Sequence, residues 1–286
     1  MLKFLTLCIS GVMLGCIYGL IALGYGLIYK ASGLMSFVQG DMLTLGAFLG
    51  LPYWLSLLLT MLCAFAFGML LEKGVIRRLL NKKVMPIYVV LATIAISYIL
   101  QNGSQLIWGT WTLNFPSVFK VSTVKLFGLL AVQPEVILCL ILSMVSMVVL
   151  HLFMNKTKLG TAMHASSMDS MAAESCGINV SLTTGITWGV SAMLAAMAGI
   201  LIGPMYGVYS SLGANLGNKG FAGAIAGGYG NMYGAIVGGI LLGLLEILVS
   251  GYVSSAYKNL IAYVALLLFL CIKPTGLFNE RAIQDV

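Results

Sequence analysis

Long apolar runs separated by short polar loops make up most of the chain. Such runs predict membrane helices, because about 20 apolar residues in a helix cross the roughly 30 Å of hydrocarbon in a bilayer. Helices also satisfy their own backbone hydrogen bonds in lipid, whereas barrel strands would alternate apolar with polar residues. We therefore expect an all-α, polytopic transmembrane helix bundle of about eight spans. The runs cover 4–29, 36–50, 53–72, 86–107, 135–154, 182–206, 233–251 and 256–272.

Two apolar segments are expected to form short or broken helices. The 36–50 run is interrupted near its start by the polar sequence Gln-Gly-Asp, and 219–231 is too short to cross a bilayer alone. In the second segment, Gly227, Gly228 and Gly230 disfavour a continuous helix. Broken helices at membrane depth usually line a cavity. Each segment either spans the membrane or enters and leaves on one side, and the pattern leaves both open.

A polar stretch from Lys156 to Leu182 separates two long apolar runs. Inside it, four apolar residues recur at i, i+3, i+4 and i+8, which places them on one side of a short helix. Gly177 follows them, where the residue just after a helix would stand. The stretch predicts a surface on which another protein docks; a solvated interhelical loop is the alternative. The four residues are Met168, Met171, Ala172 and Cys176.

Composition and charge agree with a membrane protein. Hydrophobic residues make up 60% and charged residues 8%, whereas a soluble domain carries about 25% charged residues. The 73–83 loop holds five of the fifteen lysines and arginines, and Lys156 and Lys158 follow two spans later. Positive loops stay in the cytoplasm, so we expect both loops inside and 108–134 outside. The net charge of +7 is therefore a topology signal and does not indicate nucleic-acid binding. The side of the N-terminus depends on whether 36–50 spans.

No catalytic or metal-binding pattern is present in the sequence. The six cysteines form no CxxC pair, and the two histidines have no partner at metal-ligand spacing. No GxxxxGK[ST] phosphate loop and no nucleophile–base constellation occurs. We expect no cofactor, no metal and no enzymatic activity, and an enzyme is the least favoured class. If the chain drives transport with ATP, another chain must hydrolyse it.

Glycines recur at four-residue intervals inside the apolar runs. Small residues with this spacing let helix backbones approach closely in lipid, so they predict helix–helix packing. Examples are Gly11/Gly15/Gly19, Gly223/Gly227 and Gly239/Gly243.

Two carboxylates fall inside apolar runs, where an ionised acid is costly. Asp41 is either a residue of a first helical turn, satisfied locally, or part of a transport pathway. Glu246 lies well inside 233–251, so we expect it to face the bundle and to bond a polar neighbour. A structural role and direct substrate contact are both open for Glu246.

Three segments carry recognisable motifs: SFVQGD at 36–41, the 160–179 stretch, and KPTGLF at 273–278. They resemble branched-chain amino acid ABC permeases of the LivH type. The sequence SFVQGD at 36–41 resembles a motif of that family that reads roughly NFAHGE, with Gln39 and Asp41 in place of His and Glu. The 160–179 stretch, GTAMHASSMDSMAAESCGIN, looks like the family's cytoplasmic coupling loop, although it carries less charge than usual. KPTGLF at 273–278 resembles its closing motif. The order and spacing hold over nearly the whole chain.

The resemblance implies a single permease domain over 1–286 with a cytoplasmic coupling loop at 156–181. It implies a second permease subunit, ATP-binding cassette subunits docked on a short helix at 165–177, and an external substrate-binding protein. It implies transport of branched-chain or related hydrophobic amino acids across the bacterial cytoplasmic (inner) membrane. The expected pathway residues are Phe37, Gln39, Gly40, Asp41, Gly227, Gly228, Gly230 and Glu246. The expected ATPase contacts are Ser167, Met168, Asp169, Met171, Ala172, Ala173, Glu174 and Gly177.

Two alternatives remain at the level of sequence. The first is an ABC permease for urea, short amides or sugars. The second is a secondary transporter driven by an ion gradient, with Asp41 and Glu246 as coupling acids. Such carriers often contain inverted repeats, and the halves of this chain show no clear repeat.

Overall fold

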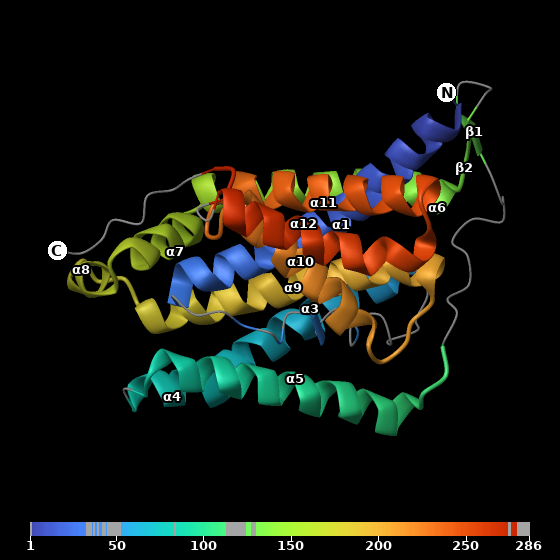
Figure 1. The fold of residues 1–286 in the computed structure, drawn as a ribbon. Coiled ribbons are helices and arrows are strands. Elements are labelled where there is room, and N and C mark those ends of the chain that lie inside the picture. The colour runs from blue at the N-terminus through green and yellow to red at the C-terminus, as the bar shows by residue number, and fades with distance from the viewer. Residues whose placement is uncertain are drawn as a thin grey trace.

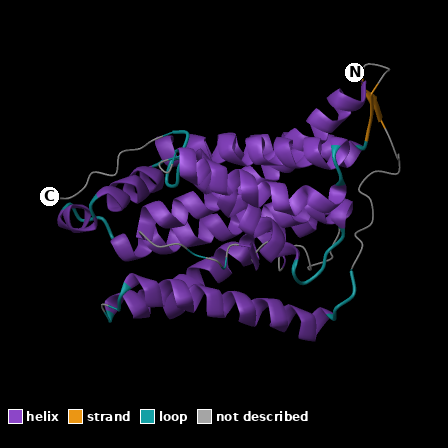
Figure 2. Ribbon diagram, viewed as in Figure 1, coloured by secondary structure: helices purple, strands orange, loops and turns teal. Residues whose placement is uncertain are grey.

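The helices lie roughly side by side and form one bundle (Figures 1 and 2). The computed structural model describes residues 2–32, 36, 38, 40–41, 44, 53–82, 84–112, 124–126, 130–273 and 276–278. Its longer helices are α1 Leu2–Ser32, α3 Tyr53–Leu71, α5 Pro86–Trp108, α6 Pro134–Lys156, α9 Val180–Tyr206, α10 Leu212–Gly227, α11 Met232–Tyr252 and α12 Lys258–Ile272. Its shorter elements are a π-helical turn Glu72–Ile76, α4 Arg77–Asn81, α7 Lys158–Met168, α8 Ser170–Ser175 and a 3-10 turn Ser255–Tyr257.

The architecture confirms a polytopic helical bundle. In the described part of the chain, six helices are long and apolar enough to cross a membrane: α1, α3 continued through α4, α5, α6, α9 and α11. The predicted 256–272 span is α12, whose 15 residues reach only roughly 22 Å. Most of the predicted 36–50 run lies outside the described residues. Residues 219–227 of the predicted 219–231 segment belong to α10, which begins earlier, at Leu212.

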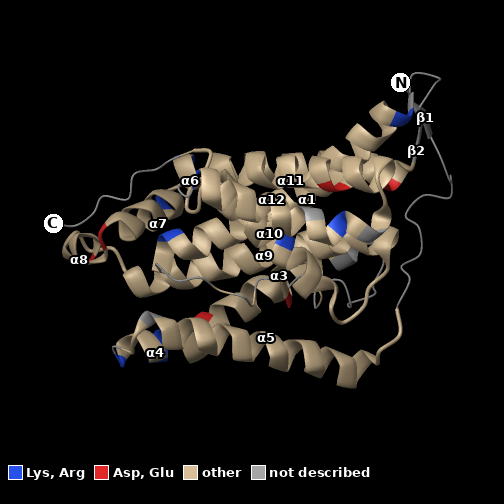
Figure 3. Ribbon diagram, viewed as in Figure 1, with Lys and Arg blue, Asp and Glu red and all other residues tan. Residues whose placement is uncertain are grey.

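Polar loops gather at the two ends of the bundle. The elements α4, α7 and α8 lie together at one end, on the left in Figure 1, where most of the coloured basic positions also lie in Figure 3. The start of α1 lies at the opposite end, beside a short antiparallel hairpin of β1 Val124–Leu126 and β2 Leu130–Val132. The sequence did not predict this hairpin. The arrangement agrees with loops 73–83 and 156–181 sharing one side and 108–134 facing the other.

Two helices form the centre of the bundle. The buried core draws mainly on α1 and α9, and nearly all of the most apolar part of α9 is buried inside the protein. Small residues make this possible, because Ala and Gly let neighbouring helices approach an inner helix from several sides. The Ser191 hydroxyl on α9 donates a hydrogen bond to the Gly24 carbonyl on α1 at 2.8 Å, which ties the two helices together.

The predicted glycine seams join α1 to α11 and α10 to α11. A Cβ atom at Gly15 would lie 2.6 Å from the Ile240 Cα, and Gly239 packs in the same way against Gly19. Gly223 likewise packs against Gly239, with 3.0 Å from its would-be Cβ to the Gly239 Cα. These distances leave no room for a side chain, so the four-residue spacing marks backbone-to-backbone packing, as predicted.

The break expected near Gly227 to Gly230 is confirmed. Helix α10 ends at Gly227, and Gly228 and Gly230 adopt φ values of +115° and +96°, which strongly favour glycine. The chain then turns into α11. A segment near the C-terminus closes the end of α10: the backbone N–H groups of Leu277 and Phe278 donate to the carbonyls of Ala226 and Gly227. This contact was not predicted.

Candidate functional site

The predicted coupling loop folds as two short helices, where the sequence predicted one helix over 165–177. Helix α7 ends at Met168, and α8 starts after Asp169, whose φ and ψ of −151° and 108° are extended. The Asp169 carboxylate accepts hydrogen bonds from the N–H groups of Met171 and Ala172 at 2.8 and 3.0 Å. A short acidic side chain that bonds the following N–H groups caps a new helix, and this explains the break.

The end of α8 matches its prediction. Gly177 has a φ of +82°, and its N–H donates to the Glu174 carbonyl. The N–H of Ile178 donates to the Ala173 carbonyl at 3.0 Å. These two bonds form a Schellman motif, which satisfies the free carbonyls of the last helical turn. Residue Gly177 therefore fixes where α8 stops and where the chain turns back towards α9.

Apolar side chains are exposed on this two-helix surface. Met168 and Met171 are 70% and 79% exposed, and Ala172 and Cys176 are also exposed. Of the eight predicted ATPase contacts, only Ala173 is buried, at 5% exposure. Exposed apolar patches of this kind are typical of interaction surfaces. We call Met168, Met171, Ala172 and Cys176 the coupling patch.

Two contacts anchor the coupling loop to the membrane helices. The Thr183 hydroxyl on α9 donates to the Ser166 hydroxyl on α7 at 3.1 Å. At the start of α9, the Arg77 guanidinium donates to the Ser181 carbonyl and forms a two-bond ion pair with Glu72, at 3.0 and 2.6 Å. Glu72 is buried and belongs to the π-helical turn between α3 and α4. Arg77 thus links the start of α9, which follows α8, to the turn between α3 and α4. The sequence did not predict this contact.

Glu246 faces the bundle and bonds polar neighbours, as predicted. It is fully buried, and it accepts hydrogen bonds from Lys219 Nζ on α10 at 2.7 Å and from the Tyr18 hydroxyl on α1 at 2.8 Å. Lys258 Nζ at the start of α12 lies 3.2 Å away. The carboxylate therefore joins four helices. The sequence did not predict Lys219 as the partner of Glu246. One feature could have indicated it, because a lysine inside an apolar run is as unusual as an acid.

Gly40 and Asp41 lie against the first half of α10. Gly40 packs on the backbone of Gly213 and Gly217 with no room for a side chain. Asp41 is 2% exposed, and no described residue donates a hydrogen bond to either of its carboxylate oxygens. The predicted pathway residues Phe37 and Gln39 lie outside the described residues.

A cavity of about 260 Å³ opens beside Asp41, between α1, α5 and α10. Ser97 and Gln101 on α5 line this cavity and also lie near the Asp41 carboxylate. The full lining comprises Tyr25, Gly40, Ile94, Ser97, Tyr98, Gln101, Ala214, Gly217 and Asn218. We call this space the α5–α10 cavity; it combines hydroxyl and amide groups with apolar side chains.

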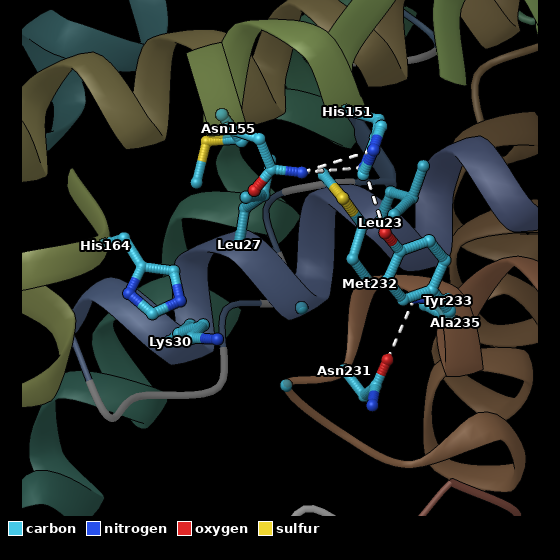
Figure 4. Close-up of a pocket in the computed structure, with 13 residues that line it drawn as sticks. Leu23, Leu27, Lys30, His151, Asn155, His164, Asn231, Met232, Tyr233 and Ala235 are labelled. Carbon is cyan, nitrogen blue, oxygen red and sulfur yellow. Dashed lines mark hydrogen bonds between the residues drawn. The ribbon is translucent and has the colours of Figure 1, made fainter. Parts of the chain in front are cut away.

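A second pocket, of about 150 Å³, lies at the end of the bundle near α7 (Figure 4). His151, Asn155 and Tyr233 form a hydrogen-bonded group on one side of it, and Lys30 and His164 lie on the other. Gly230 lines this pocket, whereas Gly227 and Gly228 pack against backbone. The predicted pathway residues that the structure describes thus fall into three places: the α5–α10 cavity, this pocket with its glycine turn, and the Glu246 cluster. Among the described residues, no group of side chains is arranged to hold a metal ion.

Comparison with known proteins identifies the family. A family model described as the permease component of the branched-chain amino acid transport system matches residues 7–270. The chain belongs to this permease family. It is 29% identical over 309 aligned positions to the high-affinity branched-chain amino acid transport system permease protein LivH of Salmonella typhimurium strain LT2, with 100% of this chain and 98% of the relative covered. LivH of Escherichia coli K12 matches at the same identity and coverage. No solved structure gives a significant match.

The family match covers most of the structure. The matched range includes the predicted coupling loop, the α5–α10 cavity and the Glu246 cluster. The resemblance seen in the sequence is confirmed, and the six long apolar helices make this permease a multi-pass membrane protein.

Proposed function

We propose that this permease is the membrane-spanning subunit of a binding-protein-dependent ABC importer in the bacterial cytoplasmic membrane. The observation that carries this proposal is the coupling patch, a set of exposed apolar side chains on a capped two-helix loop. Such a patch fits a protein partner on the cytoplasmic side. Because the sequence contains no nucleotide-binding loop, the partner that supplies energy is a separate ATPase subunit.

The contacts around the coupling loop suggest how force reaches the membrane helices. An ATPase that moves α8 would displace the start of α9, because only a tight Gly177 turn and a short link separate them. Because Arg77 bonds the Ser181 carbonyl, the turn between α3 and α4 would move with the start of α9. The hydrogen bond between Thr183 and Ser166 would make α7 move together with α9. The bundle would then alternate between outward-facing and inward-facing forms, together with a second permease subunit.

Branched-chain or related hydrophobic amino acids are the proposed substrates. Both LivH relatives are named for branched-chain amino acid transport. The α5–α10 cavity supports this choice, since Ile94 and Ala214 offer apolar wall while Ser97, Gln101 and Asn218 offer polar groups. An external binding protein would deliver the substrate at the end of the bundle that carries the hairpin.

Reconstitution tests the proposed function. The permease is placed in proteoliposomes with its ATPase subunits and second permease, and uptake of leucine, isoleucine and valine is measured with binding protein outside and ATP on the ATPase side. We expect uptake that requires ATP and the binding protein and is unchanged by collapsing ion gradients. Uptake driven by an imposed ion gradient without any ATPase would overturn the proposal. The paired state of Glu246 favours the ATP-driven result, because two lysines already neutralise it.

A further inference from the structure

Asp41 is a buried acid without a hydrogen-bonded partner among the described residues. Its side chain is 2% exposed, and neither carboxylate oxygen receives a hydrogen bond from any described residue. A buried carboxylate that lacks donors is strongly unfavourable unless a cation or a set of donors completes it. The Asp41 carboxylate therefore needs a cation or hydrogen-bond donors from outside the described residues.

The surroundings of Asp41 determine what could complete it. Ser97 and Gln101, one helical turn apart on α5, lie near the carboxylate and also line the α5–α10 cavity. The Gln101 amide bonds the Ser97 hydroxyl at 3.3 Å, so both side chains are already engaged with each other. The cavity contains no lysine, arginine or histidine in its lining. A small molecule that enters this cavity would meet several neutral polar groups and an apolar wall. The Asp41 carboxylate lies just behind this lining, next to Gly40 and near Ser97 and Gln101.

We propose that Asp41 binds the ammonium group of the amino acid as it passes through the α5–α10 cavity. This inference rests on the proposed function and adds the chemical group that the site recognises. An ammonium ion supplies three N–H donors and a positive charge, which match a carboxylate with two free oxygens. The aliphatic side chain of the same substrate lies against Ile94 and Ala214.

The second buried acid, Glu246, differs from Asp41 in its partners. Glu246 is equally buried, but Lys219, Lys258 and the Tyr18 hydroxyl already complete it. It has no free oxygen to offer a substrate without first breaking an ion pair. Asp41 is thus the acid that can receive a new cation at no such cost.

The test measures which small molecules protect the cavity from a thiol reagent. Asn218 is exposed on the cavity wall, so Asn218→Cys gives a reporter whose maleimide labelling is read by mass spectrometry of its peptide. The full-length permease is used, purified with its partner subunits and without ATP. The probes are 3-methylbutylamine, which carries an ammonium group, and 4-methylpentanoate, which has a similar carbon skeleton and a carboxylate instead.

We expect the amine to protect Cys at position 218 and the acid to protect it far less. In the Asp41→Asn background, half-protection by the amine should need roughly tenfold more compound or more, because a charged hydrogen bond is lost. Asp41→Glu keeps the charge and should retain most of the protection, which also serves as a check if Asp41→Asn folds poorly. Equal protection by the two probes, no protection by either, or unchanged protection in Asp41→Asn would overturn the assignment. None of these outcomes depends on ATP-driven uptake, so a failure here is distinct from a failure of the proposed function.

Discussion

Lys219 Nζ on α10 lies 2.7 Å from Glu246 Oε1 on α11, inside a bundle whose core consists mainly of glycine and apolar side chains. With the Tyr18 hydroxyl and Lys258 also on Glu246, a single carboxylate holds α1, α10, α11 and α12 in register. A buried ion pair of this kind adds little net stability by itself. Removing one partner, however, leaves a buried charge that nothing neutralises.

Glu246→Gln should therefore destabilise the permease, because it leaves Lys219 charged and buried. We expect a loss of about 3–5 kcal/mol in the free energy of unfolding, measured as thermal or denaturant unfolding in detergent. The double variant Lys219→Met/Glu246→Gln should recover much of that loss, since neither buried charge remains. Glu135→Gln, at the start of α6, is the matched control and should change little. Equal stability of the Glu135 and Glu246 variants would contradict the structural role of the pair.

Gly15→Ala should disrupt the seam between α1 and α11. The added methyl would lie 2.6 Å from the Ile240 Cα, so the two backbones must move apart. Gly103→Ala on α5 is the control, because nothing lies within 4 Å of its would-be Cβ. That change should be neutral or stabilising by up to about 1 kcal/mol, through helix propensity. The measurement is the melting temperature of each variant in detergent. If the Gly15 variant is as stable as the Gly103 variant, α1 and α11 do not pack closely at Gly15.

Asp169→Ala should loosen α8 without affecting the membrane helices. It removes the side-chain acceptor for the N–H groups of Met171 and Ala172, a cap that typically contributes about 0.5–2 kcal/mol. Asp169→Asn keeps an oxygen in the same place and should behave almost as the wild type. Amide hydrogen exchange over 170–175 provides the measurement. Faster exchange in the alanine variant alone is the expected result, and equal exchange in both variants would show that the cap is unimportant.

Ala172→Arg should impair ATP-driven uptake while the permease stays folded. Ala172 belongs to the coupling patch, and a long charged side chain there would obstruct an apolar partner surface. Thr161→Arg introduces the same charge on an exposed position at the start of α7 and serves as the control. Uptake and ATP hydrolysis are measured in parallel in proteoliposomes. Normal uptake in Ala172→Arg would show that the coupling patch does not dock the ATPase.

Arg77→Gln should reduce the number of substrate molecules moved per ATP hydrolysed. The change removes the ion pair with Glu72 and weakens the hold on the Ser181 carbonyl, so motion of the coupling loop reaches α3 less directly. Arg78→Gln, on the same short helix, is the matched control. We expect a lower ratio of uptake to hydrolysis in the Arg77 variant alone. A proportional fall in both rates would indicate a stability effect instead of a coupling effect.

The features that the sequence predicted well depend on local rules. Glycine spacing along α1 and α11 requires only that small residues recur on one helix face, and the stop at Gly177 requires only the left-handed conformation that follows a helix. The break after Gly227 is local in the same sense. Such signals lie within a few residues of each other, so they can be seen without knowing which helices are neighbours.

The features that the sequence missed are contacts between distant segments. Glu246 bonds Lys219, 27 positions away, and Tyr18, 228 positions away. Arg77 bonds the Ser181 carbonyl across 104 positions. The pattern showed that Glu246 needed a partner, but it could not show which helix would supply it. The prediction of a single helix over 165–177 was wrong for another reason. It relied on the spacing of apolar residues and did not consider that Asp169 can cap a new helix, which divides the segment.

The most direct test of the account is whether the coupling patch touches an ATPase in a working transporter. A photo-crosslinking amino acid is placed at Met171 in one sample and at Leu106, which is also highly exposed, in another; Leu106 lies on α5 near the opposite end of the bundle. Complexes that still perform ATP-driven amino acid uptake are irradiated, and the crosslinked partners are identified by mass spectrometry. The account predicts a crosslink to the ATPase subunit from Met171 and none from Leu106. A transport-active complex in which Met171 reaches no ATPase would contradict it.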